Sequence, residues 1–130
     1  MSKSNLSYVE LKSGYNDDGP AWICIIEYSK SKQMVYFDGK ALKRFGGDKC
    51  ASHKDVETGE CYWITGIKKR GTNRHWAGHG IIMIEENVIP EYLKITGKEK
   101  LLKSEFKTIK QLEKTEKRKF EKIFHRETER

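Results

Sequence analysis

The chain is short of apolar residues and has no long apolar run. Hydrophobic residues make up 36% of its 130 residues and charged residues 35%, the first low and the second high for a globular domain. No stretch approaches the roughly 18 consecutive apolar residues of a membrane-spanning helix. The N-terminal segment MSKSNLSYVELKSGY also lacks the apolar core of a signal peptide. We therefore expect a cytoplasmic protein that makes no contact with a membrane.

Cysteines are few as well. Cys24, Cys50 and Cys61 are the three in the chain, so at least one of them has no intramolecular disulfide partner. Proteins of the cytoplasm keep their thiols reduced by default. We expect reduced thiols in this protein.

Sequence motifs of common enzyme classes are missing too. The chain contains no nucleophile elbow, no P-loop and no dinucleotide-binding fingerprint. Its glycine clusters, Gly46-Gly47 and Gly78-His79-Gly80, do not lead from a predicted strand into a helix N-terminus, as a phosphate-binding loop would. We predict a protein that is not an enzyme and needs no cofactor.

Positive charge is abundant, and most of it lies in the last quarter of the chain. The formal net charge is +7, from 26 Lys and Arg against 19 Asp and Glu. Residues 98–130 hold 12 basic and 7 acidic residues, which leaves +5 for this segment and +2 for residues 1–97. Such a charge fits an acidic partner such as nucleic acid or a membrane surface, or it serves only to keep the surface soluble.

The first three-quarters of the chain predict short strands joined by tight turns. We expect strands or hairpin arms over Leu6–Lys12, Ala21–Tyr28, Gln33–Phe37, Lys40–Phe45, Val56–Ile64 and Gly80–Ile84. Asp38-Gly39 is a favoured two-residue hairpin turn, and residues 85–93 indicate a short turn or helix that packs back on the sheet. Five or six such strands predict a mainly β domain over residues 1–97, an antiparallel curled sheet or small SH3-like or OB-like barrel.

A different pattern begins after Gly97. The large apolar residues of this tail are Leu101, Leu102, Phe106, Ile109, Leu112, Phe120, Ile123 and Phe124. At about 100° per residue they fall within one stripe of a helix, which predicts a long amphipathic helix from about Lys98 to His125 in a basic tail, residues 98–130. Such a helix could dock on its own domain, pair as a coiled coil, lie along nucleic acid or a ribonucleoprotein, or fluctuate as an undocked tail.

The segment from Cys61 to Gly80 combines aromatic and basic residues. Its candidate binding residues are Tyr62, Trp63, Lys68, Lys69, Arg70, Arg74, His75 and Trp76. Small β-barrels that bind nucleic acid place aromatic rings for base stacking beside cations that contact phosphate. Because neighbouring residues of a strand face opposite sides, only one of Tyr62 and Trp63 can lie on such a platform, and the other belongs to the core.

Cysteine and histidine are concentrated between residues 50 and 79. The candidate metal ligands are Cys50, His53, Cys61, His75 and His79. Zinc sites favour ligand pairs at short spacings, so a structural zinc site is one hypothesis, but a lone cysteine on a strand is usually a small apolar residue. A catalytic pair of Cys50 or Cys61 with His75 or His79 would lack room for a deep pocket. We predict no metal as the main interpretation.

Five short motifs lie between Tyr8 and Gly97. They are Gly19–Ile23 (GPAWI), Val35–Leu42 (VYFDGKAL), Asp55–Glu60 (DVETGE), Tyr62–Gly66 (YWITG) and Arg74–Gly78 (RHWAG). Together they resemble a family of small uncharacterised bacterial proteins, some of which are labelled deoxyxylulose-phosphate synthases. Such a synthase resembles transketolase and needs a far longer chain with a thiamine-diphosphate motif, which this sequence does not contain. The resemblance implies a bacterial, cytoplasmic protein with a self-contained fold, and it carries over no catalytic residue.

These observations predict a non-enzymatic interaction module. The first hypothesis is that it binds RNA, DNA or a ribonucleoprotein through the basic and aromatic segment and the basic tail. The alternative is a protein-binding module, such as an immunity-type or assembly factor, in which Leu102, Phe106 and Ile109 of the tail contact a partner.

Overall fold

The computed structural model describes residues 5–12, 20–45, 52–67, 81–101, 104–116, 118 and 120. These residues form nine strands, one short 3-10 helix and one α-helix. The strands are β1 (Leu6–Leu11), β2 (Ala21–Ile25), β3 (Glu27–Tyr28), β4 (Met34–Phe37), β5 (Lys40–Arg44), β6 (His53–Asp55), β7 (Cys61–Gly66), β8 (Ile82–Glu85) and β9 (Phe106–Ile109). The helices are η1 (Glu86–Val88) and α1 (Ile89–Thr96), which together fulfil the prediction of a short turn or helix after β8.

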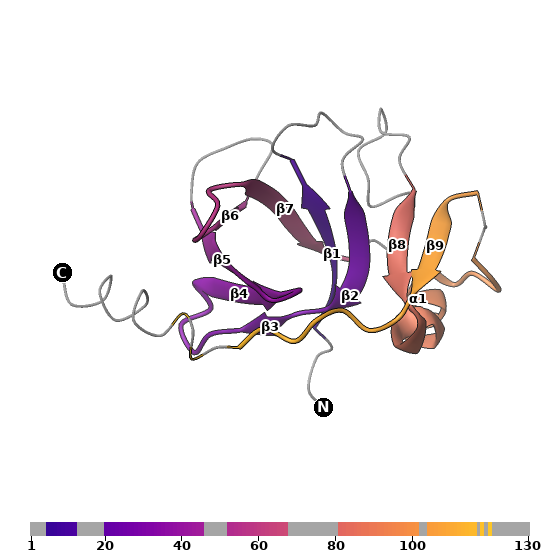
Figure 1. The fold of residues 1–130 in the computed structure, drawn as a ribbon. Helices are drawn as coiled ribbons and strands as arrows, with labels where there is room; N and C mark the ends of the chain where they lie inside the picture. Colours follow the sequence, from indigo (N-terminus) through magenta and orange to yellow (C-terminus); the bar gives the residue numbers. More distant parts are fainter. Residues whose placement is uncertain are drawn as a thin grey trace.

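All nine strands belong to one sheet, in the order β3-β4-β5-β6-β7-β1-β2-β8-β9. The sheet curls into a half-barrel (Figure 1). One bent segment accompanies the curl. The inner strand β2 leads through Ile26 alone into β3, which is the edge strand beside β4. The predicted mainly β curled sheet is confirmed, but with more than five or six strands. Six pairings are antiparallel as predicted, whereas β2–β8 and β8–β9 are parallel.

Both faces of the sheet are covered over part of its area. The first core lies between the sheet and α1 and contains Leu6, Tyr8, Ala21, Ile23, Ile82, Ile84, Val88 and Tyr92. The second core lies inside the curl and contains Val9, Cys24, Ile26, Val35, Phe37, Leu42 and Tyr62. The third core contains Met34, Ala41 and Phe120. Because β1 supplies side chains to the first core on one face and the second core on the other, its apolar residues do not alternate cleanly with polar ones.

The predicted C-terminal helix is wrong for the described residues between Lys98 and Glu116. Residues 106–109 form β9, and residues 110–116 run on in extended form. Phe106 packs against the first core, where its ring lies 5.5 Å from that of Tyr92 in an edge-to-face contact. The helical stripe was too thin to hold a helix by itself. The open edge of β8 offered backbone hydrogen bonds instead, among them Ile82 N–H to the Glu105 carbonyl at 2.9 Å.

Residues 110–116, which we call the strap, run from the β9 edge past β3 towards β4 (Figure 1). Buried Glu85 at the end of β8 holds its start. One carboxylate oxygen of Glu85 accepts the Leu112 N–H at 2.7 Å, and the other accepts the Ile25 N–H at 3.2 Å. A single carboxylate therefore joins the strap to the end of β2, and Leu112 packs against the second core.

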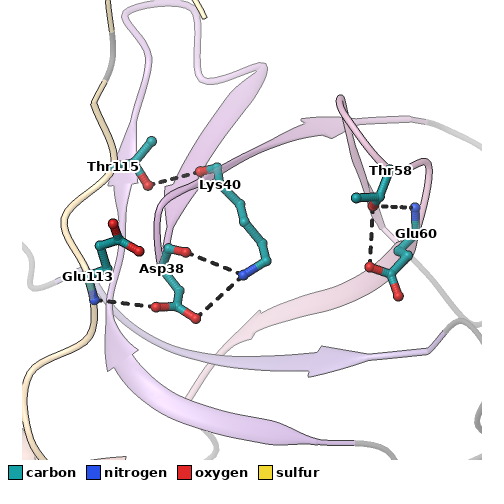
Figure 2. Close-up of polar contacts among 6 residues, drawn as sticks. All are labelled: Asp38, Lys40, Thr58, Glu60, Glu113 and Thr115. Atoms are coloured by element: carbon teal, nitrogen blue, oxygen red, sulfur yellow. Dashed lines mark hydrogen bonds and ion pairs between the residues drawn. The ribbon is translucent and has the colours of Figure 1, made fainter. Parts of the chain in front are cut away.

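The strap then crosses the turn between β4 and β5. The Glu113 N–H donates to the Asp38 carboxylate at 3.3 Å, and the Thr115 hydroxyl donates to the Lys40 carbonyl at 3.0 Å (Figure 2). The Lys40 ammonium group also lies 3.5 Å from the Asp38 carboxylate. Asp38 and Gly39 have φ angles of 47° and 75°, which confirms the hairpin turn predicted from the sequence.

Alanine at Gly39 is expected to destabilise the fold more than alanine at Gly59. The two glycines have nearly the same φ, 75° and 77°, so both variants carry the left-handed strain of about 1 kcal/mol. A Cβ at Gly39 would lie 2.8 Å from a carboxylate oxygen of Glu113, whereas a Cβ at Gly59 meets nothing within 4 Å. The carboxylate ends an exposed, flexible side chain that can turn aside, so the contact adds only about 0.5 kcal/mol to the Gly39→Ala cost.

Urea denaturation of the two single variants measures this difference. In a Glu113→Ala background the close contact with the carboxylate is absent. Gly39→Ala and Gly59→Ala should then lower the free energy of unfolding by the same amount. Equal costs in the wild-type background would contradict the contact between the strap and the turn.

Candidate nucleic-acid interface

Most of the binding residues predicted from the sequence lie outside the described residues. These are Lys68, Lys69, Arg70, Arg74, His75 and Trp76. The structure describes the remaining two, Tyr62 and Trp63, both on β7.

Tyr62 and Trp63 point to opposite faces of the sheet, as the strand alternation predicted. Tyr62 is 2% exposed in the second core, and its ring lies 6.2 Å from that of Phe37. Burial, and secondarily nearby carboxylates, raise the pKa of Tyr62 to about 12, so the phenol is neutral at pH 7. Trp63 is half-buried and packs against the first core. Tyr62 therefore serves the core and presents no open ring face to a base.

The candidate zinc ligands on β6 and β7 do not converge. His53 pairs with Tyr62, and Lys54 pairs with Cys61, so His53 and Cys61 point to opposite faces of the sheet. They cannot bind the same ion in this arrangement. Cys50, His75 and His79 lie outside the described residues. Within the part of the chain that the structure describes, no three Cys, His, Asp or Glu residues gather as a metal site would require.

His53 is an uncharged structural residue at neutral pH. Its Nδ1 atom lies 2.8 Å from the Ser52 hydroxyl, which itself accepts the Ile64 N–H at 3.0 Å. Burial first and the Arg44 guanidinium second lower the pKa of His53 to about 4. The histidine therefore adds no cation to the surface beside it.

A row of basic residues lies on the face of β4–β6 that points away from the second core, which we call the outer face. Lys43 on β5 lies directly opposite Lys54 on β6, and the next residue across the sheet from Lys43 is Met34 on β4. Phe45 follows β5 on the same face as Lys43, and the Lys54 ammonium lies 5.3 Å from the centre of the Phe45 ring. Lys54 is exposed and Lys43 and Phe45 are half-buried.

These side chains line a shallow hollow of about 390 Å³. Lys43, Arg44, Phe45, Lys54, Asp55, Val56 and Gly59 form its wall. Asp55 is the one acidic residue in this lining, and it is only 3% exposed. Its carboxylate accepts the N–H groups of Glu57 and Thr58, at 2.8 and 3.3 Å. The hollow therefore presents two lysine side chains and one aromatic ring, with its carboxylate engaged in a backbone turn.

Sequence reasoning missed this surface because it began the hairpin at Val56, whereas β6 spans His53–Asp55. The alternation in Lys40–Phe45 already puts Ala41, Lys43 and Phe45 on one face. The pairing of Lys43 with Lys54, however, depends on β6 beginning at His53 and on its register with β5. A three-residue strand with one lysine between His53 and Asp55 has too little pattern to be recognised alone.

Comparisons with models of known protein families, with curated proteins and with solved structures give no match. Across the residues that the structure describes, no helix has the length and apolar character needed to cross a membrane.

Proposed function

We propose that this protein binds nucleic acid, with the basic hollow of β5 and β6 as the contact surface for the phosphate backbone. The observation that carries the proposal is the placement of Lys43 directly opposite Lys54, beside Phe45, on the outer face. A phosphate that contacts both ammonium groups is stabilised by both charges.

The aromatic ring supplies the second part of the site. Lys54 lies over the Phe45 ring in the free protein, a cation–π contact of modest strength. When Lys54 moves to a phosphate, the ring face becomes open to a base, and base–aromatic stacking is tolerant of sequence. This chemistry suits a single-stranded RNA or DNA segment, and we propose a non-enzymatic role in the cytoplasm of a bacterium.

The alternative of a protein-binding tail has less support. Phe106 packs against the first core of its own domain, and Ile109 is the last residue of β9. Leu102 lies outside the described residues. Of these three residues, Phe106 is thus already packed within its own domain.

Binding of a fluorescent mixed-sequence single-stranded oligonucleotide tests the proposal. The affinity should fall with salt, with a log–log slope of about −0.7 for each phosphate contacted. Lys54→Ala should weaken binding roughly tenfold at low salt and reduce the slope by about 0.7. Phe45→Leu should weaken binding by a similar factor while leaving the slope unchanged, because a stacking contact releases no counterions.

Lys107→Ala provides the matched control. Lys107 is an exposed lysine on the edge strand β9, far from β5 and β6 in the sheet order, so its loss changes the net charge equally without touching the hollow. Equal effects of Lys54→Ala and Lys107→Ala would show binding by net charge alone. No binding of RNA or DNA by the wild-type protein at low salt would overturn the proposal.

A further inference from the structure

We infer that Phe120 is a positioning residue that holds Arg118 beside the basic hollow, where Arg118 contacts the same nucleic-acid backbone. This inference rests on the proposed function and extends the surface from β5 and β6 to the residues that follow the strap.

The third core, which contains Phe120, adjoins the two lysines on the outer face. Phe120 is 2% exposed and packs with Met34 and Ala41, and Tyr36 and Val56 lie against this third core. Met34 is directly opposite Lys43 across β4 and β5. Val56 is two residues beyond Lys54, on the same face, and also lines the basic hollow. The third core and the basic hollow are therefore neighbouring parts of one surface.

Arg118 is confined between two anchors at the start of β5. The Thr115 hydroxyl is fixed to the Lys40 carbonyl, and Phe120 is buried against Ala41, the next residue. Three residues of chain span at most about 11 Å, so Arg118 cannot lie far from either anchor. Lys43 is two residues further along β5 than Ala41, a separation of about 7 Å.

The side chain of Arg118 faces solvent while Phe120 is buried. Arg118 is exposed and lines a second hollow, of about 350 Å³, with Lys114, Thr115 and Glu116. A guanidinium group held in place binds phosphate with less loss of conformational entropy than one on a free chain end. Anchoring through Phe120 therefore converts a charge on the tail into a contact fixed near the start of β5, the strand that carries Lys43.

Oligonucleotide binding by full-length variants tests the inference. Arg118→Ala should reduce the affinity about fivefold to tenfold and lower the salt slope by about 0.7, the value for one phosphate on a single strand. Phe120→Ala should reproduce this loss, although it removes no charge, and Phe120→Leu should restore most of the affinity. In the Phe120→Ala background, Arg118→Ala should have no further effect.

Val88→Ala is the control for loss of packing, because Val88 is 1% exposed in the first core and is not part of the third core that holds Phe120. It should leave the salt slope unchanged. If Lys54→Ala weakens binding while Arg118→Ala and Phe120→Ala bind as wild type, the inference is overturned and the proposed function stands. If Phe120→Ala fails to fold by circular dichroism, Arg118→Ala decides the matter. If the wild-type protein binds no oligonucleotide, both the function and the inference fail.

Discussion

Replacing Phe37 with alanine is expected to lower the free energy of unfolding by about 4 kcal/mol. Phe37 is 3% exposed at the centre of the second core. Its ring contacts Trp22 and Tyr62 edge to face, with ring centres 5.1 and 6.2 Å apart. Removal of the ring leaves a cavity between two aromatic side chains that come from different strands. The inside of the curl therefore loses the side chain that joins β4 to β2 and β7.

Urea denaturation followed by tryptophan fluorescence measures this effect. Phe37→Leu retains most of the buried volume and should cost roughly 1–2 kcal/mol. Tyr28→Ala removes an aromatic ring that is 40% exposed on β3, and we expect a change within about 0.5 kcal/mol. A cost for Phe37→Ala as small as that of Tyr28→Ala would contradict a packed core inside the curl.

Replacing Glu85 with alanine is expected to lower the free energy of unfolding by about 3 kcal/mol. Glu85 is 4% exposed, and its two carboxylate oxygens accept the N–H groups of Leu112 and Ile25. Hydrogen bonds to a charged group contribute about 1.5–3 kcal/mol each, and their loss leaves two backbone donors without this acceptor. The variant should release the strap from the end of β8 and so weaken the connection that carries Arg118 and Phe120 to the outer face.

Hydrogen exchange at the amides of Leu112 and Ile25 reports directly on their hydrogen bonds to Glu85. Both amides should exchange faster in Glu85→Ala, and Glu85→Gln should keep partial protection because its side chain retains one oxygen acceptor. Glu86→Ala is the matched control, since Glu86 is the exposed neighbour of Glu85 in η1. Unchanged protection of Leu112 in Glu85→Ala would show that the strap is held by other contacts.

Sequence reasoning succeeded where local pattern and turn chemistry agreed. The segment from Gln33 to Phe45 combines two apolar runs with Asp38-Gly39, and it folds as the predicted hairpin of β4 and β5. Both turn residues adopt the positive φ angles that favour this dipeptide. The same holds for the helix after β8, where Pro90 stands in the first turn of α1.

The same reasoning failed where long-range pairing decided the structure. The run Ala21–Tyr28 was predicted as one strand, but it bends at Ile26 because its first half pairs with β1 and β8 and its second half with β4. Phe106 and Ile109 fit a helical stripe as well as a short strand. The pairing of β9 with β8 settled that ambiguity, since an unpaired edge strand gains backbone hydrogen bonds from a neighbour.

The candidate site shows the same contrast between what local pattern predicts and what long-range pairing decides. The sequence alone indicated that basic and aromatic residues are present together, and it predicted correctly that Tyr62 and Trp63 face opposite sides of β7. It did not indicate that Lys43 and Lys54, eleven positions apart, stand opposite each other. Nor did it place Phe120 beside Met34, since that contact joins residues far apart in the chain.

The sequence by itself determined the class of this fold, the central hairpin and the basic character of the protein. These features depend on residues close together in the chain, where side-chain alternation and turn preferences act. The tertiary structure decided which strands pair, how the sheet curls, where the strap crosses and which cations meet on the outer face. Those features depend on contacts between distant segments, whose register is set by the burial of whole side chains in shared cores rather than by local preference.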